Sequence, residues 1–338
     1  MTPMPSADSP VPHVEKLTVM QALNRAMRDA MRHDETVHVL GEDVGTLGGV
    51  FRVTDGLTKE FGERCFDTPL AESGIMGFAI GMAMGGLRPI VEMQFDAFAY
   101  PAFEQITSHV AKMRNRTKGQ VHLPMVIRIP YGGGIGGVEH HCDSSESYYT
   151  HTPGLTVVAP SNPADAYHLL RAAIASPDPV IVMEPKRLYW SKAEVDLSRP
   201  RPGIGKAAIV REGKDATIVA YGQSVPVALE AAEVAKREGR DLQVIDLRSL
   251  VPFDDATVMA AVASTGRAVV VAEAQGFSSF SSEVAARIGE RCFHSLAAPV
   301  RRVTGFDIPY PPPKLEKHYL VSVDRILDAV DSLQWEDQ

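Results

Sequence analysis

Short apolar runs alternate with amphipathic stretches along most of the chain. The runs have the length of buried strands, and the stretches between them carry apolar side chains at the three- and four-residue spacing of a helix face. In the first half, strands are predicted near 37–40, 88–95, 125–129, 155–160 and 179–184, and helices near 17–31, 101–116 and 161–173. This alternation predicts a mainly parallel sheet with helices on both faces.

The alternation restarts after a segment rich in proline and glycine, which is interpreted as a linker at 197–206. Strands are predicted at 216–221, 242–245, 268–271 and 300–303, with helices at 224–238, 254–263, 279–288 and 323–333. The predicted fold class is therefore α/β, with two doubly wound domains. The predicted division is a flexible arm at 1–15, a first domain at 16–196 and a second at 207–338.

A glycine-rich helix is predicted after the stretch 66–75 (FDTPLAESGI). Thr68 is expected to cap it, with Pro69 in the first turn and Glu72 near the start, where the helix dipole favours a carboxylate. Each glycine costs a helix about 1 kcal/mol relative to alanine, so another backbone or a cofactor is expected to pack closely against this one. Glu72 is either a solvated charge or a carboxylate held in a dry site to exchange a proton. The glycines are at positions 74, 77, 81, 85 and 86.

An acidic turn, 41–45 (GEDVG), follows the first predicted strand. Ligands of open α/β sheets bind at the carboxyl ends of strands. Glu42 and Asp43 are therefore either site residues or ordinary turn formers, and the pattern does not separate the two.

A second glycine run, with Gly132, Gly134 and Gly137 in GxGxxG spacing, follows another strand. The residues after it are polar, and no acid lies at the strand end expected about 20 residues on, so a dinucleotide site is disfavoured. A mobile loop beside a catalytic group fits better. The following residues, HHCD at 140–143, show no second ligand pair at metal-site spacing. These residues are therefore either part of an ordinary polar loop or include a functional histidine.

Composition narrows the function classes further. The chain has 338 residues, 45% of them apolar, and a net charge of −8, which argues against a general nucleic-acid binder. It has no apolar run near the roughly 20 residues of a membrane span. Its start is rich in proline and serine and does not look like a signal peptide. Three widely spaced cysteines imply no disulfide framework, so a cytoplasmic location is expected.

Several long motifs, in one order over most of the chain, resemble the β subunit of thiamine-diphosphate-dependent 2-oxo acid dehydrogenases. The resemblance implies a transketolase-like fold, with an aminopyrimidine-binding domain followed by a domain that mainly supports assembly. The stretch GVFR at 49–52 is more similar to branched-chain members than to pyruvate members. The matching motifs are 41–45 (GEDVG), 48–52 (GGVFR), 66–72 (FDTPLAE), 86–90 (GLRPI), 153–155 (PGL), 244–248 (VIDLR) and 302–305 (RVTG).

The resemblance assigns roles to five residues. Glu72 matches the glutamate that hydrogen-bonds the pyrimidine ring nitrogen of the cofactor and favours the tautomer that removes the thiazolium proton. Leu70 and Gln94 match positions that line the pyrimidine, and Phe98 matches the aromatic residue that stacks on it. His141 matches the histidine that faces the substrate and assists proton transfer and acylation of the lipoyl group.

Two departures from the family pattern affect these assignments. Asp96 stands one place earlier than the usual acid, which puts a specific role for it in doubt. Cys142 and Asp143 replace a Ser-Gln pair, so the hydrogen bonds around His141 are expected to differ. His140 competes with His141 as the catalytic imidazole.

The resemblance also implies partners. The α subunit supplies Mg²⁺ and the diphosphate site through a Gly-Asp-Gly pattern that this sequence lacks. No metal ligands are expected in this chain, apart from a possible structural monovalent cation. An α2β2 heterotetramer is therefore expected, which passes acyl groups to a lipoyl acyltransferase core.

The implied reaction is oxidative decarboxylation of 3-methyl-2-oxobutanoate, 4-methyl-2-oxopentanoate and 3-methyl-2-oxopentanoate. The alternatives are pyruvate or acetoin as substrate, a non-catalytic assembly subunit, and a nicotinamide oxidoreductase built on the second glycine run.

Overall fold

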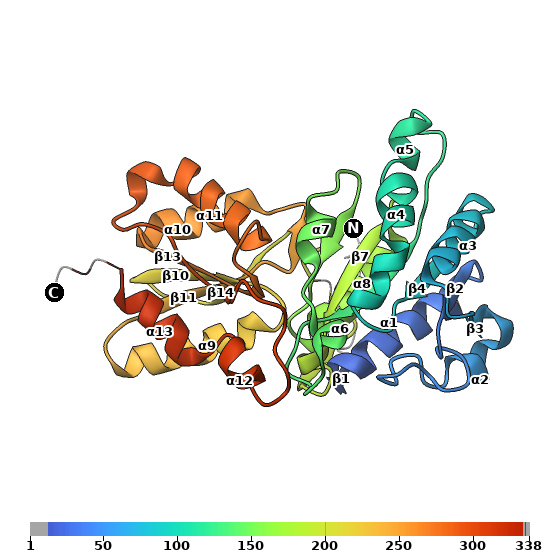
Figure 1. Ribbon diagram of the computed structural model, residues 1–338, viewed down its shortest axis with the longest axis horizontal. Helices are drawn as coiled ribbons and strands as arrows, with labels where there is room; N and C mark the ends of the chain where they lie inside the picture. Colours follow the sequence, from blue (N-terminus) through green and yellow to red (C-terminus); the bar gives the residue numbers. More distant parts are fainter. Residues whose placement is uncertain (1–12, 200, 334, 336–338) are drawn as a thin grey trace, which may run out of the picture.

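The computed structural model describes residues 13–199, 201–333 and 335. Two sheets, each between layers of helices, form the two halves of the molecule (Figure 1). The first sheet has seven strands, all parallel except the edge strand β12. In spatial order they are β12 (Ser249–Val251), β6 (Thr156–Val158), β7 (Val180–Pro185), β5 (Val126–Tyr131), β4 (Arg88–Glu92), β2 (Val37–Gly41) and β3 (Cys65–Asp67).

The second sheet has five strands, and only its edge strand β9 runs antiparallel. Its order is β14 (Arg301–Gly305), β13 (Ala268–Gln275), β10 (Ala216–Ala220), β11 (Leu242–Asp246) and β9 (Ala208–Arg211). A separate antiparallel ribbon joins β1 (Val14–Thr18) to β8 (Lys192–Asp196). The two doubly wound, mainly parallel sheets confirm the predicted fold class.

The helices of the first half cover both faces of its sheet, because successive strand residues point to opposite sides. On one face, α1 (Val19–His33) and α8 (Pro163–Ala175) pack on residues such as Val39. On the other, α3 (Glu72–Met84) and the segment 97–111 pack on residues such as Leu40. The Asn162 side chain caps α8, as expected from the Asn-Pro sequence at its start.

The second half is built in the same way. One face of its sheet carries α9 (Ser224–Arg237) and α13 (Val323–Asp331), and the other carries α10 (Asp255–Thr265) and α11 (Phe280–Arg291). The apolar cluster under α10 and α11 is continuous with the one under α3. The two halves therefore share a hydrophobic core across their boundary.

Local patterns missed some elements. The long helix expected at 101–116 is wrong: the segment consists of a 3₁₀ helix (Ala97–Ala102), α4 (Phe103–Gln105), a π-helical turn (Ile106–Val110) and α5 (Met113–Arg116). β1, β3, β8, β9 and β12 were not predicted. The remaining short α-helices are α2 (Leu57–Phe61), α6 (Glu139–Cys142), α7 (Glu146–Thr150) and α12 (Glu316–Tyr319), and 3₁₀ helices occur at Gly62–Arg64, Lys186–Leu188 and Phe293–Ser295.

Two features of the structure bear on the predicted domain limits. Residues 1–12 of the predicted arm lie outside the described residues, and Val14 already belongs to β1. At the other boundary, β12 falls within the predicted second domain but pairs with β6 of the first sheet. Beside it, Arg248 Nη2 lies 2.9 Å from Asp165 Oδ1 in a buried ion pair between the halves. The limits 16–196 and 207–338 remain a prediction.

Candidate functional site

The glycine-rich helix begins later than its sequence suggests. Ala71 is the N-cap of α3 and makes no side-chain cap bond, so the predicted capping role of Thr68 is wrong. A tight turn, closed by the Ala71 N–H to the Pro69 carbonyl at 2.8 Å, separates Thr68 from the helix. The Thr68 hydroxyl is instead buried without a hydrogen-bond partner. Glu72 does lie in the first turn, as expected.

Two carboxylates meet near this helix start. Glu72 is half-buried, whereas Glu42, just after β2, is only 4% exposed. Oε1 of Glu42 has no hydrogen-bond partner within the described chain. Burial, together with the nearby charges of Glu72 and Asp43, raises the pKa of Glu42 to about 7. The drier carboxylate is thus Glu42, which the motif-based assignment passed over and only its strand-end position indicated.

Leu70 and Gln94 lie in different environments. Leu70 is 82% exposed, so the described part of the chain leaves it largely uncovered. Gln94 is half-buried, and its side-chain amide donates a 2.8 Å hydrogen bond to Oδ2 of Asp43. Gln94 therefore connects the end of β4 to the acidic turn that carries Glu42.

His141 lies within a group of aromatic rings. Its ring centroid is 4.3 Å from that of Phe95 and 5.4 Å from that of Phe98, both edge-to-face. Phe51 extends the group, with its centroid 5.4 Å from Phe95. The half-buried imidazole makes no hydrogen bond to any described residue, whereas His140 is exposed and pairs with Glu139 at 3.0 Å. Of the two histidines, His141 is the one that faces Phe98.

The residues around His141 have structural partners of their own. Cys142 is buried, and Asp143 accepts a 3.0 Å hydrogen bond from the Tyr100 hydroxyl instead of contacting the imidazole. Asp96 is fully buried and accepts a 2.8 Å bond from the Ser145 N–H. Asp96 thus holds the chain just after His141.

Lys186 is a buried cation that sequence reasoning missed. Its Nζ has no hydrogen-bond partner in the described structure and lies 5.9 Å from the centroid of the Phe95 ring. Burial lowers the pKa of Lys186, while the charges of Asp96 and Glu273 oppose this effect. A lysine directly after a buried strand was the available signal.

The second glycine run contacts the other half of the molecule. The N–H of Gly133 donates to Oε1 of Glu273 at 2.6 Å, and that of Gly134 donates to Oε1 of Glu316 at 2.9 Å. These two hydrogen bonds attach the loop to the second half of the chain, and the mobility of the loop stays a prediction. The same contacts remove the donors that a dinucleotide pyrophosphate would need.

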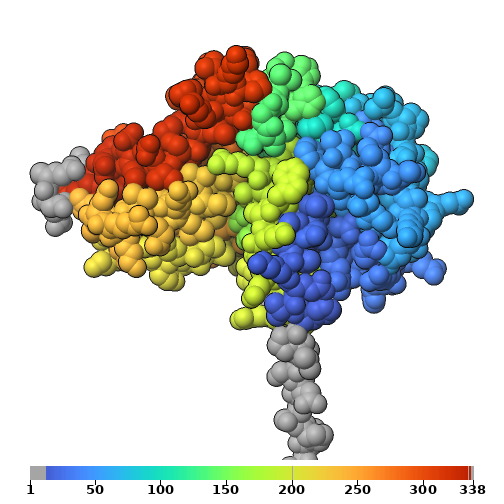
Figure 2. All heavy atoms as spheres, turned by 90° about the horizontal axis from the view of Figure 1, so that it is seen from below, coloured from blue at the N-terminus to red at the C-terminus, as the bar shows by residue number. Residues whose placement is uncertain are grey.

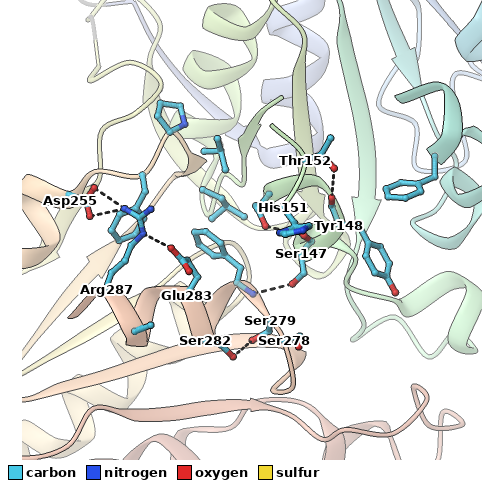
Figure 3. A pocket seen from close by; sticks show the side chains of 18 residues that line it. Ser147, Tyr148, His151, Thr152, Asp255, Ser278, Ser279, Ser282, Glu283 and Arg287 are labelled. Carbon is cyan, nitrogen blue, oxygen red and sulfur yellow. Dashed lines mark hydrogen bonds and ion pairs between the residues drawn. The ribbon is translucent and has the colours of Figure 1, made fainter. Parts of the chain in front are cut away.

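A separate cleft of about 1160 Å³ opens between the two halves, where Arg287 pairs with Asp255 and Glu283 (Figure 3). The five predicted site residues are absent from its described lining. Across the described ranges, no cluster of three potential metal ligands occurs, and no helix is long and apolar enough to cross a membrane.

Two family models match the chain, "Transketolase, pyrimidine binding domain" over 15–191 and "Transketolase, C-terminal domain" over 205–326. A solved structure titled "Split gene transketolase, inactive beta4 tetramer" aligns with a TM-score of 0.77 and 24% identity, covering 94% of this chain and 98% of that one. The fold is therefore that of the transketolase-like class.

Curated relatives narrow this class. A "Pyruvate dehydrogenase E1 component subunit beta" from Leifsonia xyli is 57% identical, covering 97% of each chain. A "3-methyl-2-oxobutanoate dehydrogenase subunit beta" from Mycobacterium tuberculosis is 54% identical, covering 94% of this chain and 92% of that one. A "2-oxoisovalerate dehydrogenase subunit beta" from Bacillus subtilis is 45% identical, covering 94% and 98%. The chain belongs to the family of β subunits of thiamine-diphosphate-dependent 2-oxo acid dehydrogenases. Membership implies an α partner within an enzyme complex.

Proposed function

We propose that this chain is the β subunit of a branched-chain 2-oxo acid dehydrogenase. The substrates are 3-methyl-2-oxobutanoate, 4-methyl-2-oxopentanoate and 3-methyl-2-oxopentanoate, and the acyl group passes to lipoyl-lysine of an acyltransferase core. The observation that carries the substrate proposal is the aromatic group Phe51–Phe95–His141. The Phe95 ring connects Phe51 of the GVFR stretch to the candidate catalytic histidine, and an apolar wall there favours a branched aliphatic side chain.

The described residues fit one end of thiamine diphosphate. Two buried oxygens near the start of α3, Oε1 of Glu42 and Oγ1 of Thr68, lack hydrogen-bond partners, and a polar heteroaromatic ring would supply them. Leu70, Gln94 and Phe98 line the pyrimidine in this proposal. When bound, the cofactor supplies the nucleophilic carbon and the electron sink for decarboxylation.

The protein's own contribution is to manage protons and exclude water. Glu72 holds a proton at the pyrimidine ring nitrogen, and the nearby Glu42 keeps the local charge sensitive to pH. His141 moves a proton on the substrate side, where Phe95 and Phe98 shield its ring from water.

The α partner is proposed to pack on the exposed face of α3. A Cβ added at Gly77 or Gly81 would meet no atom of the described chain within 4 Å outside the helix backbone, and Phe78 and Met84 are each 57% exposed. In the proposed α2β2 assembly, the α chain holds Mg²⁺ and the diphosphate. A structural monovalent cation and a cytoplasmic location remain part of the proposal.

A second candidate keeps the fold and cofactor but takes pyruvate. The Leifsonia xyli relative, named as a pyruvate dehydrogenase subunit, favours it at 57% identity. Acetoin is a third substrate of the same kind.

Substrate competition tests the proposal. The chain is co-purified with its α partner, and ferricyanide reduction is followed on 3-methyl-2-oxobutanoate and on pyruvate, with and without thiamine diphosphate and Mg²⁺. Cofactor-dependent turnover that favours the branched acid supports the proposal. Equal or faster turnover of pyruvate overturns the substrate and keeps the mechanism.

Glu72→Ala tests whether this chain is catalytic. We expect turnover to fall about 100-fold or more with assembly intact, while Glu230→Ala, an exposed carboxylate on α9, changes neither. Unchanged turnover in Glu72→Ala would point to a subunit that only supports assembly.

A further inference from the structure

The glycine loop at 132–137 is held by a carboxylate from the opposite half of the chain. Oε1 of Glu316, at the start of α12, accepts from the N–H of Gly134 at 2.9 Å and from that of Gly136 at 3.2 Å. The Tyr310 hydroxyl donates to the same oxygen at 2.8 Å. The segment near residue 316 lies directly against the segment near residue 136 in the space-filling view (Figure 2).

The other end of the loop is fixed as well. The Gly132 N–H donates to the Asp143 carbonyl at 2.7 Å, which closes the loop around α6. Next to it, the Gly133 N–H donates to Glu273 Oε1 at 2.6 Å. Loop and short helix therefore form one unit, attached to the second half through Glu273 and Glu316.

This unit carries His141. Val138, two residues after Gly136, is the N-cap of α6, and the His141 N–H bonds to its carbonyl at 2.9 Å. A Cβ on Gly137 would lie 3.1 Å from the Cβ of His141, so loop and histidine are in close contact. A shift of the loop must therefore be transmitted to the imidazole ring.

We propose that Glu316 is a positioning residue for His141, with Tyr310 orienting its carboxylate. Glu316 acts through the Gly134 and Gly136 amides and sets where the imidazole lies against Phe98. The proposal rests on the proposed role of His141. It gives the second half of the chain a part in the chemistry, beyond the assembly role that the family resemblance implied.

A carboxylate suits this task better than a neutral side chain. A charged acceptor makes hydrogen bonds about twice as strong as a neutral one, and one oxygen here serves two amides and a hydroxyl. Glutamine would keep an acceptor oxygen and lose the charge. Glu316→Gln is therefore the conservative variant, and Glu316→Ala removes the contact.

The test uses the assembled complex loaded with thiamine diphosphate and Mg²⁺. We expect Glu316→Ala to lower kcat about 10- to 100-fold, since small misplacements of a catalytic group have effects of this size, with half-saturation by the cofactor unchanged. Glu316→Gln should recover part of the loss. Lys317→Ala, at an exposed position in the same helix, is the matched control and should match the unaltered enzyme.

A double-variant cycle separates positioning from general structural support. If Glu316 acts through His141, Glu316→Ala should have no further effect in the His141→Ala background. An equal loss in both backgrounds overturns the proposal, as does an unchanged kcat in Glu316→Ala while His141→Ala loses turnover. If His141→Ala itself keeps full turnover, the proposed role of the histidine fails, and the positioning proposal fails with it.

Hydrogen exchange supplies a readout independent of turnover. A peptide covering 131–142 should exchange faster in Glu316→Ala than in Lys317→Ala, because the Gly136 amide loses its acceptor and the Gly134 amide keeps only the Tyr310 hydroxyl at 3.3 Å. Unchanged exchange there would show that Glu316 does not hold the loop and would overturn the proposal even if turnover fell.

Discussion

The two glycine-rich segments differ in what lies beside them. In the loop at 132–137, a Cβ on Gly132 would fall 1.9 Å from Nε2 of Gln223, and one on Gly133 would fall 1.8 Å from the Tyr310 hydroxyl oxygen. In α3, a Cβ on Gly77 or Gly81 would meet nothing in the described chain within 4 Å outside the helix backbone. The loop needs glycine because side chains from the second half of the chain lie against it. On the open face of α3, no neighbour in the described chain requires glycine.

The carboxylates beside the two glycine-rich segments differ in the same way. Glu273 and Glu316, beside the loop, accept hydrogen bonds from its amides. Glu42, near the start of α3, has a buried oxygen without a partner. The comparison teaches where to look for a binding partner. A glycine without crowding neighbours, or a buried oxygen without a hydrogen-bond partner, indicates a surface that another molecule covers.

The largest effect is expected for Gly133→Ala. Its Cβ would overlap the buried Tyr310 hydroxyl, so tyrosine or loop must move. We expect the free energy of unfolding to fall by about 3 kcal/mol, at the upper end for overpacking, measured by denaturant unfolding. Gly136→Ala is the control within the loop: its φ of +71° is strained for alanine, but no atom lies within 4 Å. It should cost about 1 kcal/mol. Equal costs would contradict the steric account.

Gly81→Ala should have effects of opposite sign on the free chain and on the assembly. Alanine stabilises an exposed helix by about 1 kcal/mol relative to glycine, so the unfolding midpoint of the free chain should rise. Binding of the α partner, measured by titration, should weaken because the added methyl group occupies the contact face. Gly289→Ala in α11, also without neighbours within 4 Å, should stabilise equally and leave binding intact. Unchanged binding in Gly81→Ala would place the partner elsewhere.

Tyr310→Phe is a smaller change at the contact between the glycine loop and the second half of the chain. It removes one hydroxyl that donates to Glu316 and accepts from the Gly134 N–H at 3.3 Å. A hydrogen bond to a charged group contributes about 1.5 to 3 kcal/mol, and Glu316 keeps its two amide donors, so we expect a loss of about 1.5 kcal/mol in thermal unfolding. A loss near that of Gly133→Ala would mean that the ring itself, and not its hydroxyl, sustains the contact.

The last prediction concerns Glu42→Gln, whose effect is visible in the pH dependence of stability. The pKa of Glu42 is raised in the folded chain by burial and by its acidic neighbours, so the folded state binds a proton more tightly than the unfolded state. Stability from this group is full below its unfolded pKa near 4.3 and is lost as pH rises towards 7. Between pH 5 and pH 8 the melting temperature should fall less in Glu42→Gln than in the unaltered chain. Parallel curves would contradict the prediction.

Sequence patterns predicted the elements that bury their own residues locally. β11 contains Val244 and Ile245 in an apolar run, and α8 carries its cap in Asn162, so both were predicted. β12 was missed because three residues carry no periodicity, and its partner β6 lies about 90 positions away in the chain. Thr68 was misread because a cap signal in sequence does not show that a turn intervenes.

The candidate site also combines residues that the sequence predicts with residues that it does not predict. Glu72 and His141 lie in motifs that can be recognised in sequence. Glu316 contacts Gly134 across 182 positions, and Lys186 is defined by burial, so neither has a local pattern. The ring contact between Phe51 and Phe95 likewise depends on the packing of two distant loops.

The edge strand β12 also defines what can be exchanged between related proteins. A fragment that ended at the proline-rich linker would leave β6 without its antiparallel neighbour, and uncovered strand edges promote aggregation. It would also leave Asp165 buried without Arg248. A chimaera that grafts this first half onto another second half should therefore carry the chain through Val251 or import a matching strand with its arginine. The exchangeable module is thus not the unit that the linker suggests.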